Sequence, residues 1–382
     1  MKSYINNKKE EMLQLLGDLV NMESGTYDKQ GVDQVGSFLK KMYNQLGFTV
    51  DVQNEERYGN HLVLKHINCN DEPKIIIVAH MDTVFPKGTT KKRPFSHDGK
   101  RAYGPGVIDM KGSHVSLLYA IKALTKVDEN CLQNILIVFN SDEEIGSPSS
   151  RKLIERLAEG KQYALIMEPS RANGKLVSSR KGGGRFMLKI TGKGAHSGIE
   201  PEKGISAIEE LAHKITKLHQ LTDYEEGINV NVGLIKGGTS LNTIAPHAEA
   251  QIEMRVKTMK QAEEVSQEIK EICSHPDVEG TKLELKGGIT RPPMVKNEKA
   301  KCLVSLVKEI GEELGIIVDD VSTGGGSDGA FTSAQGVPTI DGLGPIGGNA
   351  HSDKEYLEIN SLVERTLLLA RIIQVLSKDS AS

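Results

Sequence analysis

The 382-residue sequence predicts an α/β fold: a mixed, largely parallel sheet with helices on both faces, into which a ferredoxin-like α+β module is inserted. Short and almost wholly apolar runs, typical of strands buried on both faces, alternate with helical patterns and predict the sheet. A change of element order in the middle of the chain predicts the insertion. The length also favours two domains, because single cores rarely grow beyond about 250–300 residues.

The first part of the chain begins with two amphipathic helices and continues with buried strands. Apolar residues recur at helical spacing over residues 10–22 and 32–48. The strand candidates are 61–67, 74–80, 134–140 and 163–168, and a helix is expected at 114–124. Strands alternating with helices in this way are typical of a parallel sheet.

The element order changes near residue 182. From there to Pro293 we expect, in order, a strand at 185–192, a helix at 204–218, strands at 228–238 and 248–256, a helix at 259–274 and a strand at 281–288. This β-α-β-β-α-β order is that of ferredoxin-like modules. The first pattern then resumes with a helix at 301–315, a strand at 337–342 and a helix at 359–377. We therefore predict a discontinuous larger domain, residues 1–181 and 294–382, and an inserted domain, residues 182–293.

Composition argues against several classes of protein. The formal charge is −3, with 48 Lys and Arg against 51 Asp and Glu, so no basic excess indicates a nucleic-acid partner. No segment approaches the ~20 apolar residues of a membrane span, and the N-terminus lacks the apolar stretch of a signal peptide. The four cysteines (Cys69, Cys131, Cys273, Cys302) form no CxxC pair. We expect a cytoplasmic protein with no nucleic-acid or membrane partner.

Histidines and carboxylates gather where the predicted strands end. They are His80, Asp82, Asp109, Asp142, Glu143, Glu144, Glu168 and His351. Open α/β sheets build their sites at the carboxyl ends of strands, and imidazole and carboxylate are good zinc ligands. A two-metal site needs a bridging carboxylate, about two further ligands per ion and a separate base, and this set can supply them. Taken singly, His80 and Asp82 could be a surface turn, and Asp109 a helix cap.

Seven motifs, in order, make the chain resemble metallopeptidase family 20. They are "AHMDTVFPKG", "AYGPGVIDMKG", "FNSDEEIGSPSSR", "MEPS", "GKGAHSG", "TGGGSDGA" and "HSDKEYLE", and they cover nearly the whole chain. Within that family the sequence looks most like the bacterial zinc-dependent glutamate carboxypeptidases, which cleave C-terminal glutamate from folates. The resemblance implies that His80, Asp109 and Glu168 bind one zinc ion and that Asp109, Glu144 and His351 bind the other. Two zinc ions per subunit are expected, although cobalt or manganese suits the same ligands.

The same resemblance gives roles to the remaining acids. Glu143 would be the general base that acts on a metal-bridging water or hydroxide and passes a proton to the leaving amine. Asp82 would orient His80. The peptide bond between Asp109 and Met110 would be cis. Asp142 receives no family role and could orient its neighbours or cap the turn.

The inserted domain resembles the family's lid and dimerisation domain, which implies a homodimer. His196 would reach the site of the other subunit and stabilise the oxyanion. Asn242 and Arg291 would hold the substrate near its free carboxylate, and Arg180 and Lys181 could meet an anionic substrate at the entry to the lid. Without the resemblance, His196 and Asn242 would be interpreted as turn residues and Arg291 as a solvated loop cation.

Three functions remain open at this point. The first is a dizinc exopeptidase that removes a C-terminal residue, perhaps glutamate, from a small peptide or an acylated amino acid. The second is an N-acyl-amino-acid amidohydrolase of the acetylornithine or succinyl-diaminopimelate deacylase type. The third is a binding protein that kept the fold and lost catalysis, which would lack the base or a ligand. Since Glu143 and all five metal-site residues are present, the sequence argues against the third function. The first two would use the same metal site and base, and the fuller likeness to the glutamate carboxypeptidases in "DEEIGSPSSR" and "RPPM" favours the exopeptidase.

Overall fold

The computed structural model describes residues 1–378 and divides the chain into two compact units. Unit 1 comprises residues 1–179, 296–323 and 327–378, and unit 2 comprises Arg180–Val295 and Gly324–Gly326. The boundaries predicted from the sequence differ from these by two residues at each junction. The glycines 324–326, expected in the larger domain, lie in unit 2 because the Arg180 guanidinium donates to the carbonyls of Gly325 (2.9 Å) and Gly326 (3.4 Å).

Unit 1 is built on a six-stranded mixed sheet in the order β1-β2-β6-β3-β7-β14. The strands are β1 (Phe48–Gln53), β2 (His61–His66), β3 (Ile75–His80), β6 (Ile135–Asn140), β7 (Tyr163–Ile166) and β14 (Thr339–Ile340). Neighbouring strands from β6 to β14 pair in parallel, whereas β2 pairs antiparallel with both of its neighbours, β1 and β6. The predicted mixed and largely parallel sheet is confirmed.

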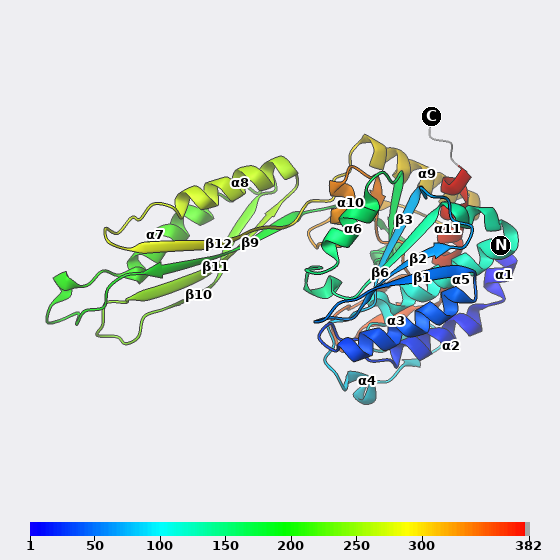
Figure 1. Ribbon diagram of the computed structural model, residues 1–382, viewed down its shortest axis with the longest axis horizontal. Coiled ribbons are helices and arrows are strands. Elements are labelled where there is room, and N and C mark those ends of the chain that lie inside the picture. The colour runs from blue at the N-terminus through cyan, green and yellow to red at the C-terminus, as the bar shows by residue number, and fades with distance from the viewer. Residues whose placement is uncertain (379–382) are drawn as a thin grey trace. The chain divides into compact units, whose positions relative to one another are not determined.

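Alternation along the central strands divides the core of unit 1 into two. In β3, Ile75, Ile77 and Ala79 face one core, and Ile76 and Val78 face the other. The first face is covered by α1 (Lys2–Asn6), α2 (Lys9–Val20), α3 (Lys29–Asn44), α5 (Gly112–Val127), α9 (Glu298–Leu314) and α11 (Ile359–Lys378), and the second by α6 (Arg151–Ala158) and α10 (Gly329–Ala334) (Figure 1). Helices on both faces are therefore confirmed.

Shorter elements complete unit 1. They are α4 (Thr89–Lys92), a four-stranded sheet in the order β15 (Gly347–Gly348), β16 (Tyr356–Glu358), β5 (Arg101–Tyr103) and β4 (Ser96–His97), and the pair β13 (Asp320–Thr323) and β8 (Leu176–Arg180). Within residues 1–378, none of the helices combines the length and the apolar composition needed to cross a bilayer.

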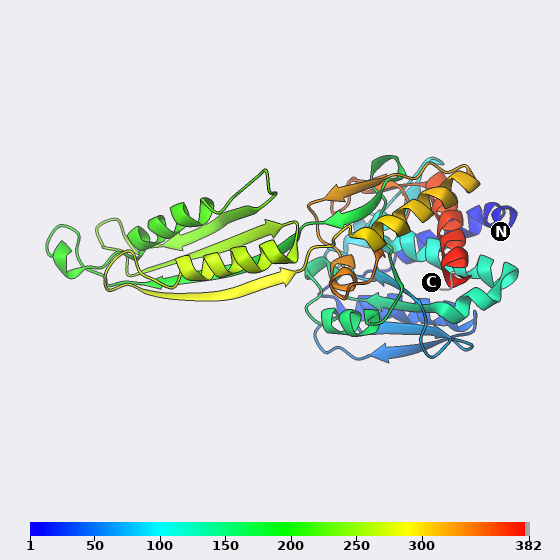
Figure 2. The ribbon, with the colours of Figure 1, turned by 90° about the horizontal axis from the view of Figure 1, so that it is seen from above.

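Unit 2 is a four-stranded antiparallel sheet in the order β10-β11-β9-β12. Its elements are β9 (Gly182–Thr191), α7 (Ala207–His219), β10 (Asn229–Gly237), β11 (His247–Val256), α8 (Met259–Ile272) and β12 (Lys282–Arg291). Figures 1 and 2 show α7 and α8 on one face of the sheet, where Phe186, Leu188 and Ile190 of β9 are buried beneath them. The predicted ferredoxin-like order is confirmed.

Candidate metal centre

The candidate centre lies in unit 1, where three parallel strands end at one edge of the sheet. The register pairs His80, the last residue of β3, with Asn140, the last residue of β6. It pairs Val78 with Ile166 at the end of β7, so Glu168 follows at the same edge. The hydrophobic strands thus carry the polar residues after them to one place.

Asp109 lies between two histidines. It belongs to the segment Val107–Lys111, just before α5, and its peptide bond to Met110 is cis, as the resemblance implies. Its Oδ1 lies 3.1 Å from Nε2 of His80, and its Oδ2 lies 3.1 Å from Nε2 of His351. One carboxylate therefore faces an imidazole with each of its oxygens.

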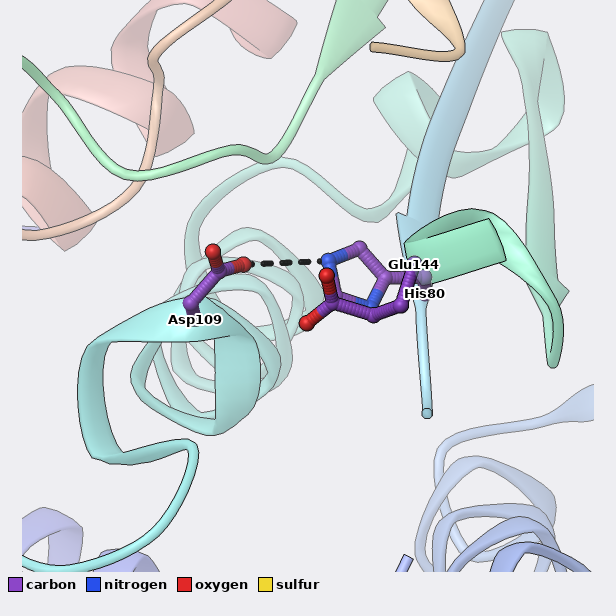
Figure 3. Close-up of side chains that lie close together, drawn as sticks. All are labelled: His80, Asp109 and Glu144. Atoms are coloured by element: carbon purple, nitrogen blue, oxygen red, sulfur yellow. Dashed lines mark hydrogen bonds and ion pairs between the residues drawn. The ribbon is translucent and has the colours of Figure 1, made fainter. Parts of the chain in front are cut away.

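Two further carboxylates complete the arrangement. Oε1 of Glu168 lies 3.7 Å from Nε2 of His80, and Oε2 of Glu144 lies 3.1 Å from Nε2 of His351. Asp109 thus stands between two pairs of groups, one formed by His80 and Glu168 and the other by His351 and Glu144. Figure 3 shows His80, at the end of its strand, facing the carboxylates of Asp109 and Glu144.

The donor set fits cations. Ligand atoms of His80, Asp109 and Glu144 all lie within 4.8 Å of one another, as do those of His80, Glu143 and Glu168. Oε1 of Glu144 is buried and accepts no hydrogen bond from residues 1–378. A buried carboxylate oxygen without a partner is costly, and a divalent ion among these oxygens would satisfy it. The residues present therefore suit divalent metal ions.

Crowding of these groups perturbs their pKa values. Burial favours the neutral form and, together with Asp109, raises the pKa of Glu144 to about 7. Hydrogen bonds to Asp109 and Glu144 raise the pKa of His351 to about 10. Burial alone would lower the pKa of His80, but Asp109 and Asp82 raise it well above 6.5. The metal-free centre therefore tends to retain protons, and ions that bind these ligands must displace them.

Asp82 connects His80 with the turn that carries Glu143 and Glu144. Its carboxylate accepts hydrogen bonds from Oγ1 of Thr26 (2.7 Å) and from the backbone N–H groups of Glu143 (3.2 Å) and Glu144 (3.3 Å). Nδ1 of His80 lies 3.4 Å from this carboxylate but 2.9 Å from the backbone oxygen of Asp82. Asp82 is thus placed both to orient His80 and to fix the turn that carries the two glutamates.

The carboxylate of Asp142 is hydrogen-bonded to two serines. Its Oδ2 accepts hydrogen bonds from the backbone N–H of Ser149 (2.6 Å), from the Ser149 hydroxyl (2.7 Å) and from the Ser150 N–H (3.2 Å), and its Oδ1 accepts one from the Ser150 hydroxyl (2.5 Å). The side chain is fully buried. Asp142 therefore caps the turn that leads into α6, one of the two roles that the sequence left open.

The structure adds supporting residues that the sequence did not single out. Thr26 donates to Asp82, and Nε2 of His114 lies 2.7 Å from the backbone oxygen of His80. The carboxylate of Glu355 accepts three backbone N–H groups of the loop that carries Asp109. The one available signal was the position of Glu355 in "HSDKEYLE", four residues after His351.

The remaining predicted site residues lie in unit 2. His196 is exposed and pairs through its backbone with Thr243, next to Asn242, whose carbonyl accepts the Ser197 N–H at 3.0 Å. Arg291 ends β12 and is half-buried. Arg180 is buried against the glycines described above, and Nζ of Lys181 donates to the Gly227 carbonyl (2.8 Å).

Two histidines and four carboxylates, gathered beside the carboxyl edge of a largely parallel sheet, form the kind of donor set that metal-dependent hydrolases use. The chain belongs to peptidase family M20/M25/M40, whose sequence pattern matches residues 76–375. Both the resemblance and the prediction that the protein is a hydrolase are confirmed.

Known proteins resemble the chain over nearly its whole length. It is 33% identical over 377 residues to "Carboxypeptidase G2" of Pseudomonas sp. (strain RS-16), covering 95% of this chain and 88% of that one. The aminopeptidase PepT of Bacillus cereus superposes with a TM-score of 0.81 at 23% identity, covering 97% and 99% of the two chains. YXEP of Bacillus subtilis, described as a dinuclear metal-binding M20 peptidase, superposes with a TM-score of 0.70 at 17% identity, covering 98% and 100%.

Proposed function

We propose that this chain is a dinuclear zinc-dependent exopeptidase that hydrolyses the amide bond next to a C-terminal glutamate. The observation that carries the proposal is the position of Asp109, with an oxygen 3.1 Å from each of two histidines that in turn lie beside Glu168 and Glu144. The likeness to Carboxypeptidase G2 supports the choice of carboxypeptidase.

Five residues would hold the ions: His80, Asp109 and Glu168 the first, and Asp109, Glu144 and His351 the second. Bound zinc ions supply a Lewis acid for the scissile carbonyl and lower the pKa of water. The metal-binding atoms of Glu143, His80 and Glu168 fall within 4.8 Å of one another, so the Glu143 carboxylate lies beside the centre.

Glu143 would take the proton from the attacking water and deliver it to the leaving amine. The turn that presents Glu143 is fixed by its own N–H, which donates to Asp82. Asp82 would at the same time keep His80 in the tautomer and orientation that leave Nε2 available to an ion.

Residues of unit 2 would recognise the substrate. The Arg291 fork suits the free carboxylate of a C-terminal residue because it can donate two parallel charge-assisted hydrogen bonds. Asn242 would bind near the same carboxylate, and the cations of Arg180 and Lys181 would favour an anionic substrate.

The inserted domain would form a homodimer in which His196 serves the partner's site and stabilises the oxyanion. Strand β10 is at an edge of its sheet, and Leu234 and Ile235 within it and Leu241 shortly after it are all exposed. An exposed apolar group at a sheet edge favours association with a second chain.

Complementation tests the shared site. Homodimers of His196→Ala and of Glu143→Ala, each inactive, are mixed under conditions that exchange subunits. Heterodimers then contain one site with both residues intact, so activity should return to about a quarter to a half of the wild-type value. Heterodimers that are demonstrated by mass spectrometry but remain inactive would contradict a role for His196 in the partner's site.

A substrate screen tests the function itself. Protein reconstituted with zinc or cobalt is incubated with C-terminal glutamyl peptides, N-acyl glutamates, acetylornithine and succinyl-diaminopimelate, and released amino acids are quantified. Release of glutamate without deacylation of the other two is expected. Deacylation of acetylornithine or succinyl-diaminopimelate alone would favour the amidohydrolase, and no hydrolysis by metal-loaded protein would refute both.

A further inference from the structure

Glu355 is a buried carboxylate that the proposed chemistry does not use. Its side chain is almost inaccessible, at 1% exposure, although it stands four residues after the exposed His351. Oε1 accepts the backbone N–H of Ile108 (2.9 Å) and that of Asp109 (3.2 Å), and Oε2 accepts the N–H of Gly106 (3.1 Å). Both carboxylate oxygens are therefore directed at one short loop.

This loop needs an external acceptor. Gly106 has a left-handed φ of 71°, and Gly106, Ile108 and Asp109 precede the start of α5 at Gly112, so their N–H groups are not part of the hydrogen bonding of that helix. Buried N–H groups left unpaired would each be costly. Glu355 pairs three of them through one carboxyl group, and these hydrogen bonds are charge-assisted whenever that group is ionised.

The other side of the loop is held independently. The Lys111 side chain is buried, and its Nζ donates to the backbone oxygen of Met22 at 2.7 Å, two residues beyond the end of α2. This contact fixes the loop against the helical layer but does not relate it to His351. Glu355 does, because it belongs to the same short segment as His351, and its own N–H donates to the Ser352 carbonyl.

We propose that Glu355 is a positioning residue that sets Asp109 and His351 at the separation needed to bind two ions. Asp109 presents one oxygen to each side of the centre, so a small rotation of its loop would misplace a ligand of both ions. Glu355 would thus govern cation affinity through backbone hydrogen bonds, without touching an ion. This inference rests on the proposed function only in taking the centre to be a metal site.

The test compares Glu355→Gln with Glu358→Gln. Glutamine keeps the size of the side chain but turns an N–H₂ group toward a backbone donor. Glu358, three residues further on, is half-exposed and ends β16, where it pairs with Arg101 of β5. Dissociation constants for Zn²⁺ and Co²⁺ are measured by competition with a chelator, and the visible spectrum of the Co²⁺ protein is recorded.

Glu355→Gln should raise the dissociation constants of both ions by about 10- to 100-fold and change the Co²⁺ spectrum, while Glu358→Gln stays within about twofold of wild type. Circular dichroism of the metal-free proteins establishes that they are folded. A purely structural role would lower the unfolding temperature and leave the affinities unchanged, which would overturn the inference. If Glu355→Gln does not fold, Glu355→Asp, which keeps the charge on a shorter stem, should show the same loss of affinity in smaller measure, and wild-type affinity in that variant would overturn it too.

The two proposals fail in distinguishable ways. Wild-type protein that binds no divalent ion would overturn the proposed function and this inference with it. Wild-type protein that binds two ions, together with a folded Glu355→Gln that binds them equally well, would overturn only the role of Glu355.

Discussion

Replacing the Asp142 carboxylate by the neutral amide of asparagine should lower the free energy of unfolding markedly, although the two side chains have almost the same shape. The buried carboxylate accepts four hydrogen bonds, two from Ser149 and two from Ser150. An asparagine can keep its oxygen toward the three donors now shared by Oδ2. Its N–H₂ group then faces the Ser150 hydroxyl, which loses the acceptor it has in Oδ1.

The magnitude follows from these contacts. A hydrogen bond to a charged acceptor contributes about 1 kcal/mol more than one to a neutral acceptor, so three weakened bonds cost about 3 kcal/mol. The displaced Ser150 hydroxyl adds up to about 1 kcal/mol, since Asn140 already donates to the same oxygen. Asp142→Asn should therefore destabilise unit 1 by about 3–4 kcal/mol.

Thiol labelling during urea unfolding provides the assay, because the two domains need not unfold together. Cys131 is buried in unit 1 and Cys273 is buried in unit 2, so labelling of each cysteine reports its own unit. Asp51→Asn is the matched control: Asp51 is exposed in β1, and the same substitution there should change stability by less than about 0.5 kcal/mol. Equal effects of Asp142→Asn and Asp51→Asn on the Cys131 transition would refute the reasoning.

Three further outcomes are expected. Glu143→Gln should lower kcat by about 10²- to 10⁴-fold without changing the metal content of the protein. Glu159→Gln, at an exposed position, should have the kcat and metal content of wild type. A lowered metal content in Glu143→Gln would instead make Glu143 a metal ligand. Removal of metal with a chelator should abolish hydrolysis and added zinc or cobalt should restore it, so activity that survives verified demetallation would contradict a metal mechanism. In unit 2, hydrogen bonds from Lys214 and Lys217 lower the pKa of Asp277 to about 2 from an ordinary 3.8, so its stabilising contribution is present above pH 3.8 and is lost as the pH falls toward 2. The difference in unfolding temperature between wild type and Asp277→Asn should accordingly shrink over that range, and a constant difference would argue against the ion pairs.

The elements that the sequence predicted best are those whose residues are buried in a regular pattern. Strand β3 begins one residue after the predicted run and ends with it, because every one of its residues is buried. Strand β1 was not predicted, since it lies at the edge of its sheet, with Thr49 and Asp51 exposed and Val50, Val52 and Gln53 only half-buried. The strands β15, β16, β5 and β4, two or three residues long, are too short to show any period.

The residues of the site likewise fall into those that could be predicted from local sequence and those that could not. The histidines and acids could be named because they directly follow apolar strands or stand in recognisable motifs. Thr26 and Glu355 could not, because Thr26 acts on Asp82 across 56 positions and Glu355 acts on the Asp109 loop across 246. Contacts at such separations, made to backbone groups in the case of Glu355, leave no periodic or local signal in a single sequence.

Three consecutive acids at the end of β6 illustrate what the chain's geometry adds to residue type. The sequence Asp142-Glu143-Glu144 places like charges side by side, which favours dispersal of the three side chains. The turn separates them: Asp142 is directed into the serines before α6, Glu144 toward His351, and Glu143 toward His80 and Glu168. Because the backbone N–H groups of both glutamates donate to Asp82, the position of this turn depends on the strand that carries His80. The negative charge of the three acids is thereby divided between a hydrogen-bonded cap and a cluster suited to cations. The same contact couples Glu143, the proposed general base, to the strand that carries His80, a proposed metal ligand.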